Sequence, residues 1–134
     1  MKVVIDTNVL RATIKKSNFE HFIYEAFKSE AFLWVVSTEI LMEYEEKLTE
    51  FYSSYTAQLV LGVLENANNT VFTEPSFKWD LIIEDPDDNK FSDLAISSNA
   101  YLVTRDKHFK IFNKIQFPKL TVVSPEEFRE IIKC

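Results

Sequence analysis

The sequence predicts an α/β fold, a three-layer α/β/α sandwich built on a parallel five-stranded sheet. Five short apolar runs alternate with helical patterns along the 134 residues, and this alternation places parallel strands between two layers of helices. The first run, Val3 to Ile5, has no polar alternation, as expected of a strand that is buried on both faces. The run ends in Asp6, so the fold would carry an acid to the carboxyl edge of the sheet, where α/β proteins bind ligands.

The elements of the first half of the chain follow from apolar spacing and from helix-capping residues. Helical spacing from Phe19 to Phe27 predicts an amphipathic helix. The β run at 32–36 stops at Ser37 and Thr38, which are good helix-start residues. The elements expected in order are a short helix at 9–15, a helix after Ser17 and Asn18, a strand at 32–36, a helix at 38–51, a helix after Ser53 and Ser54, and a strand at 71–72.

The second half begins with a segment that is harder to interpret. Residues 75–84 are expected to form a loop, with a short helix or strand at 81–83 as an alternative. A helix opens at residues 85–88, and its inner face comprises Phe91, Leu94 and Ala95, which places Asp93 on the solvent side. Strands are expected at 101–104 and 120–123. A final helix is expected from Glu126, because Pro125 precedes it at a favourable starting position.

Length and composition predict a single folded domain, residues 1–134, with a charged surface. Its residues are 46% hydrophobic and 14% aromatic, which excludes disorder. No apolar run is long enough to span a membrane, and the first residues lack the pattern of a signal peptide. We therefore expect a cytoplasmic protein without membrane attachment. The single cysteine, Cys134, agrees with a reducing compartment and is not expected to be catalytic.

The net charge of −6 argues at first against a nucleic-acid partner, because phosphate binding needs lysine and arginine. The charge is unevenly distributed, however. The segment 105–119 holds one acid, Asp106, and several bases: Arg105, Lys107, Lys110, Lys114 and Lys119. A basic patch beside an acidic site is therefore compatible with the sequence.

Four acids lie near strand ends or helix starts on the predicted carboxyl edge of the sheet: Asp6, Glu43, Asp88 and Asp106. Carboxylates from separate elements are the ligands that Mg²⁺ and Mn²⁺ take in proteins. Each acid has a structural alternative. Asp6 and Asp106 could cap the segments that follow them, the acids at 85–88 could simply favour a helix start, and Glu43 is one of several acids on a solvated helix. Their coincidence at one edge favours a site.

These residues resemble the PIN-domain ribonucleases, the fold of many bacterial toxins of toxin–antitoxin systems. The resemblance spans the chain and rests on four segments: Val4-Ile5-Asp6-Thr7-Asn8, Ser37-Thr38-Glu39-Ile40-Leu41-Met42-Glu43-Tyr44, Asp85-Pro86-Asp87-Asp88-Asn89-Lys90-Phe91 and Leu102-Val103-Thr104-Arg105-Asp106. It implies the strand order 3-2-1-4-5. It also implies that the four acids bind Mg²⁺ or Mn²⁺ and catalyse RNA hydrolysis, assisted by Asn8 and Thr104.

The register of the third acid is ambiguous, since Asp87 is an alternative to Asp88 and Asp93 is a poorer one. By this resemblance, Asp6 is the anchoring ligand, and a cognate antitoxin and a homodimer are expected. Arg105 and Lys107 are placed to meet the RNA backbone, with a solvated basic surface as the alternative.

Two other protein families that share the β-α pattern fit this sequence less well. A phosphoaspartyl phosphatase needs a second Asp where this chain has Asn8, and a response-regulator receiver needs a lysine where Ser124 and Pro125 stand. The main alternative is a PIN-like domain that binds RNA or a protein without cutting. The presence of all four acids weighs against it.

Overall fold

A computed structural model describes residues 1–133, and Cys134 lies outside the described residues. The strands form one parallel sheet in the order β3-β2-β1-β4-β5, which confirms the predicted fold class and strand order. Their bounds are β1 (Lys2–Ile5), β2 (Leu33–Val36), β3 (Thr70–Phe72), β4 (Tyr101–Val103) and β5 (Val122–Val123). The fifth strand is therefore shorter than the predicted 120–123.

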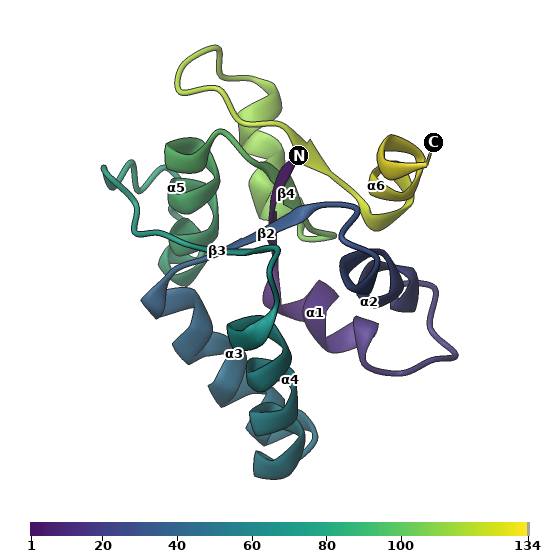
Figure 1. The fold of residues 1–134 in the computed structure, drawn as a ribbon. Coiled ribbons are helices and arrows are strands. Elements are labelled where there is room, and N and C mark those ends of the chain that lie inside the picture. The colour runs from purple at the N-terminus through teal and green to yellow at the C-terminus, as the bar shows by residue number, and fades with distance from the viewer. Residues whose placement is uncertain (134) are drawn as a thin grey trace.

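Helices cover both faces of this sheet, and Figure 1 shows α5 on one face with α2 and α6 on the other. The α-helices are α1 (Thr7–Thr13), α2 (His21–Lys28), α3 (Thr38–Phe51), α4 (Ser54–Asn66), α5 (Asn89–Ser98) and α6 (Pro125–Ile132). Two 3₁₀ segments, η1 (Pro86–Asp88) and η2 (Lys107–Asn113), precede α5 and follow β4. The hydroxyls of Ser37, Ser53 and Ser124 accept backbone N–H groups at helix starts, as the sequence predicts. Across residues 1–133, no helix has the length and apolar character needed to cross a membrane.

The hydrophobic core surrounds the central strand. Val3, Val4 and Ile5 of β1 have no exposed surface, which explains the absence of polar alternation in this run. Beside the sheet, Phe27, Phe32, Trp34 and Phe128 form an aromatic cluster with ring centroids 5.2–6.1 Å apart. This cluster joins α2 and β2 to α6 and so connects distant parts of the chain.

The segment between β3 and η1, residues 73–85, contains neither helix nor strand, so the loop expectation is correct and the alternative element at 81–83 does not form. The segment nevertheless packs on α5. The Asn89 side chain accepts the Ile82 N–H at 2.8 Å and donates to the Ile82 carbonyl at 3.0 Å. Asp93 accepts the Trp79 N–H at 3.0 Å and is 3% exposed. The predicted exposure of Asp93 is therefore wrong, because an irregular loop covers the helix face that points away from the sheet.

Candidate active site

Asp6 follows β1 and lies at the centre of the carboxyl edge of the sheet. Its backbone N–H donates to the Val103 carbonyl at 3.0 Å, which aligns it with the end of β4. Asp6 occupies the N-cap position of α1, yet its side chain makes no capping hydrogen bond. Instead, Asp6 Oδ2 accepts the Thr104 hydroxyl at 2.6 Å, and the residue is only 6% exposed. The capping alternative therefore does not account for this buried carboxylate.

Glu43 reaches the same region from α3. Its Oε2 accepts the Thr7 hydroxyl at 2.5 Å, and its Oε1 accepts a hydrogen bond from Lys90 Nζ at 2.6 Å. The side chains of Glu43 and Lys90 are 17% and 12% exposed, so this ion pair is largely removed from water. The next residue, Tyr44, fixes the helix to β1 because its hydroxyl donates to the Ile5 carbonyl at 2.5 Å.

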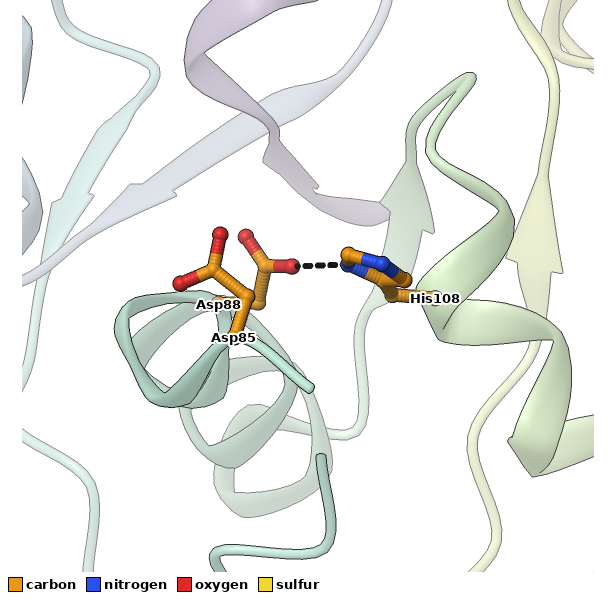
Figure 2. A group of neighbouring side chains, drawn as sticks. All are labelled: Asp85, Asp88 and His108. Atoms are coloured by element: carbon orange, nitrogen blue, oxygen red, sulfur yellow. Dashed lines mark hydrogen bonds and ion pairs between the residues drawn. The ribbon is translucent and has the colours of Figure 1, made fainter. Parts of the chain in front are cut away.

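The His108 side chain lies between Asp88 and Asp106 and contacts both. His108 Nδ1 lies 3.1 Å from Asp88 Oδ2 and 3.5 Å from Asp106 Oδ1. Asp106 also caps η2, since its Oδ1 accepts the His108 N–H at 2.9 Å. Ligand-type atoms of Asp85, Asp88 and His108 lie within 4.8 Å of one another, and Figure 2 shows both carboxylates beside the imidazole. Asp85 has a structural role as well, because it caps η1 by accepting the Asp87 N–H at 3.2 Å.

The electrostatics show that the four predicted acids share one environment. Burial raises the pKa of Asp6 to about 6, and the negative charges of Asp88, Asp106 and Glu43 raise it further, while the Thr104 hydrogen bond acts in the opposite direction. Burial also raises the pKa of Asp88, and the charges of Asp106 and Asp85 add to this effect. The hydrogen bond to Asp88 raises the pKa of His108. The site therefore concentrates negative charge where water is scarce.

The structure brings together Asp6, Glu43, Asp88, Asp106 and Thr104 and leaves other predicted site residues outside this cluster. Asn8 is exposed in the first turn of α1, and Asp87 is exposed beside Asp88. Lys107 is exposed as well. Arg105 points to other partners, because its guanidinium contacts Glu20 and Glu126, each at 2.7 Å.

Three residues in contact with the acids were missed by the sequence reasoning: Thr7, Lys90 and His108. Lys90 carried a detectable signal. It lies in the first turn of α5, where the helix dipole disfavours a cation, so a lysine there is stabilised by an acidic partner. His108 is one of two histidines in the chain and comes two residues after Asp106, but spacing alone does not separate it from a surface residue.

The donor set suits a hard divalent cation. Among the described residues, Asp85, Asp88 and His108 bring ligand atoms within 4.8 Å of one another, the charges of Asp88 and Asp106 act on Asp6, and that of Asp106 acts on Asp88. Carboxylate oxygens of this kind hold Mg²⁺ or Mn²⁺ together with water. Burial is the main cause of the raised pKa of Asp6, and repulsion from the neighbouring carboxylates Asp88, Asp106 and Glu43 adds to it. A divalent cation would remove this repulsion, so the residues present fit such an ion.

Comparison with known proteins agrees with this architecture. A family model for the PIN domain matches residues 2–108 of the chain. Among solved structures, the chain is similar to one in a crystal structure of VapBC2 from Rickettsia felis bound to a DNA fragment from their promoter. The TM-score is 0.65 at 18% identity, and the match covers 92% of this chain and 98% of that chain. No curated protein matches the chain in sequence.

Proposed function

The chain belongs to the PIN-domain family, and from this premise we propose that it is a ribonuclease that depends on Mg²⁺ or Mn²⁺. The observation that carries the proposal is that the charges of Glu43, Asp88 and Asp106 all act on Asp6, which is 6% exposed. An acid whose pKa is raised by burial and by three other acids is typical of functional sites. An ordinary helix start or solvated surface does not explain it.

In this proposal, Asp6, Asp88 and Asp106 hold the ion, and Glu43 completes the acidic cluster. Bound Mg²⁺ or Mn²⁺ supplies a more acidic water and stabilises negative charge on a phosphate. The Thr104 hydroxyl orients Asp6 through the 2.6 Å hydrogen bond. Asn8, exposed at the start of α1, would orient a water or the substrate. Lys107 would attract the RNA backbone, and Arg105 would do so by leaving Glu20 and Glu126, whose two carboxylates outweigh its single charge.

The test is cleavage of single-stranded RNA by the purified protein with Mn²⁺, beside an Asp6→Asn variant. We expect the variant to lose at least about a hundredfold in rate, because it removes the central carboxylate from the cluster. Asp80→Asn is the matched control, since Asp80 is exposed on the loop over α5. Equal cleavage by the wild type and Asp6→Asn, or none by the wild type with either metal, would refute the ribonuclease proposal. The second outcome would favour a domain that binds RNA or protein without cutting.

We also propose that the chain is the toxin of a toxin–antitoxin pair and that it forms a homodimer. Two observations favour a protein partner: the fold is shared with a chain of the VapBC2 structure, and α1, α2 and α4 line a mostly apolar groove of about 390 Å³. On the rim of this groove, Leu59 is 54% exposed. Co-expression with the product of an adjacent short reading frame should give a complex on size-exclusion chromatography and suppress RNA cleavage. A separate monomer that remains fully active would contradict this assignment.

A further inference from the structure

Three aromatic side chains gather on the surface of the molecule, apart from the core and from the acidic residues of the site. Phe77 and Trp79 belong to the loop 73–85, and Phe117 follows η2. The Trp79 ring centroid lies 4.8 Å from that of Phe77 and 5.4 Å from that of Phe117. Phe77 is 58% exposed and Phe117 is 77% exposed. This outer aromatic triad therefore leaves ring surface in contact with solvent.

Hydrogen bonds to α5 hold the loop that carries two of these rings. The Trp79 N–H donates to Asp93 at 3.0 Å, and the Ser76 N–H donates to the Ser97 hydroxyl oxygen at 3.0 Å. These contacts fix the backbone on both sides of Phe77. Rings that are already in position lose little conformational entropy when a ligand stacks on them.

Both segments of the triad are connected to the candidate active site. The loop 73–85 ends at Asp85, which caps η1. Asp106 caps η2, and the chain after η2 forms the loop above α5 in Figure 1 that carries Phe117. Asp93, the partner of Trp79, comes five residues after Asp88, which corresponds to about 8 Å along the helix axis. Since stacked nucleotides are about 3.4 Å apart, a strand of a few nucleotides is long enough to contact both places.

Positive charge accompanies the triad. All bases of segment 107–119 other than His108 are exposed lysines, and the segment contains no acid although the chain has a net charge of −6: Lys107, Lys110, Lys114 and Lys119. None of the four forms an ion pair with another described residue. The loop 73–85 is acidic, with Lys78 as its only base. The charge that favours a phosphate backbone therefore comes from segment 107–119.

We propose that the outer aromatic triad, together with the lysines of segment 107–119, binds single-stranded RNA by stacking its bases beside the acidic site. Proteins that bind single strands combine exposed rings, which stack on bases, with basic residues that follow the phosphates. A protein partner is less favoured, because lysine is depleted from protein interfaces. The inference rests on the proposed RNA substrate and specifies which part of the RNA is bound and where.

The test is binding of a fluorescently labelled single-stranded RNA of about 12 nucleotides, which is long enough for sites of this kind. Anisotropy at low salt in a chelator measures binding without cleavage. We expect Phe117→Ala to weaken binding by about tenfold, because it removes one stacking ring. Tyr55→Ala is the matched control, since Tyr55 is 74% exposed on α4. An RNA of equal length that lacks bases should bind the wild type and Phe117→Ala equally, since it offers only the backbone.

Two further measurements separate stacking from charge. RNA should quench tryptophan fluorescence, and because Trp34 is 3% exposed, the quenching reports on Trp79. Lys114→Ala should reduce the slope of log affinity against log salt by about 0.7, whereas Phe117→Ala should leave this slope unchanged. Lys133→Ala is the matched control for the loss of one charge, since the Lys133 side chain is 71% exposed at the end of α6.

Equal binding of the intact RNA by the wild type and Phe117→Ala, or no binding in chelator, overturns the inference. RNA cleavage with Mn²⁺ decides the ribonuclease proposal separately. A chain that binds RNA through the triad without cleaving it would support the inference and refute the ribonuclease proposal. A dimer that Phe117→Ala dissociates, with RNA binding unchanged, would assign this surface to a second copy of the chain. Circular dichroism of each variant identifies the folded samples.

Discussion

The aromatic cluster and the acidic edge, defined as Asp6, Glu43, Asp88 and Asp106, both contain buried side chains. Burial has opposite consequences in the two regions. In the aromatic cluster, Phe32 is 2% exposed and its ring contacts Phe27, Trp34 and Phe128, so removing it from water stabilises the fold. At the acidic edge, Asp6 is 6% exposed and burial raises its pKa to about 6. Ionised Asp6 therefore destabilises the metal-free fold.

The difference separates a region whose burial stabilises the fold from one whose burial opposes it. Aliphatic or amide residues at the acidic edge would fold more easily than crowded carboxylates do. In the proposed function, a bound cation would make these carboxylates favourable. The unfavourable electrostatic energy of the metal-free site would then be released by metal binding. The predictions below test this contrast, beginning with the largest expected effect.

The largest effect should come from the aromatic cluster. Phe32→Ala leaves a cavity between β2 and α6, and we expect the free energy of unfolding to fall by about 3–5 kcal/mol. Urea denaturation followed by tryptophan fluorescence measures this change. Tyr55→Ala is a suitable control, because Tyr55 is 74% exposed and its removal creates no cavity. A loss below about 1 kcal/mol for Phe32→Ala would contradict the role given to the cluster.

Asp6→Asn should change the free energy of unfolding in the opposite direction and raise it. The native pKa of Asp6 is about 6 and its ordinary value is 3.8, so the folded state binds the proton more tightly than the unfolded state does. The stability contributed by protonated Asp6 is complete below pH 4 and disappears as the pH rises through 6. With a chelator at pH 8, we therefore expect Asp6→Asn to be more stable than the wild type by up to about 3 kcal/mol.

The same comparison at pH 3 should show almost no difference, because Asp6 is then largely protonated in both the folded and the unfolded protein. Saturating Mn²⁺ at pH 8 should stabilise the wild type more than the variant, since the ion binds the native carboxylate. Urea denaturation under the three conditions provides the measurement. A variant that is less stable than the wild type in chelator at pH 8 would show that Asp6 does not strain the fold.

A smaller effect should separate Asp88 from Asp87. Asp88 contributes to the raised pKa of Asp6 and lies 3.1 Å from His108, whereas Asp87 is exposed. Asp88→Asn should therefore weaken Mn²⁺ binding by about tenfold, while Asp87→Asn should change it by less than about threefold. Calorimetric titration of the two variants decides between them. A larger loss in Asp87→Asn would make Asp87 the third acid.

The smallest effect is expected outside the acidic edge, at Arg105. Its guanidinium contacts Glu20 and Glu126, but its side chain is 46% exposed, so Arg105→Ala should cost less than about 1 kcal/mol in stability. Because those acids already use much of its charge, Lys107→Ala should weaken RNA binding more than Arg105→Ala. Fluorescence anisotropy with labelled RNA at low salt compares the two. The reverse order would mean that RNA displaces Arg105 from its acidic partners.

The fold was predictable because its signals are local and repeated. β1 is apolar on both faces, and serine caps mark the starts of α3, α4 and α6, so neither depends on distant residues. Asp93 shows the limit of such signals. Its helix face was assigned from periodicity, but residues 73–85 cover it with a loop whose path depends on the Asn89 and Asp93 side chains.

The candidate site was less accessible to residue patterns alone. Asp6 could be located from the end of its strand, whereas Glu43 sits among other acids on α3 and helical periodicity does not single it out. The ion pair between Glu43 and Lys90 joins residues 47 positions apart, and no local spacing encodes such a contact. The role of His108 likewise depends on how η2 returns toward η1. Local patterns locate single residues, and packing decides which of them meet.

The hydroxyl of Tyr44 has a consequence for how mobile the acidic residues can be. It joins the middle of the molecule, at the Ile5 carbonyl, to the helix that carries Glu43, and Trp34 Nε1 donates to it at 3.4 Å. Sliding or rotating α3 would leave this hydroxyl and that carbonyl without partners in a water-free interior. The separation between Glu43 and Asp6 is thus set by the interior of the protein, and a ligand at the surface meets a rigid frame.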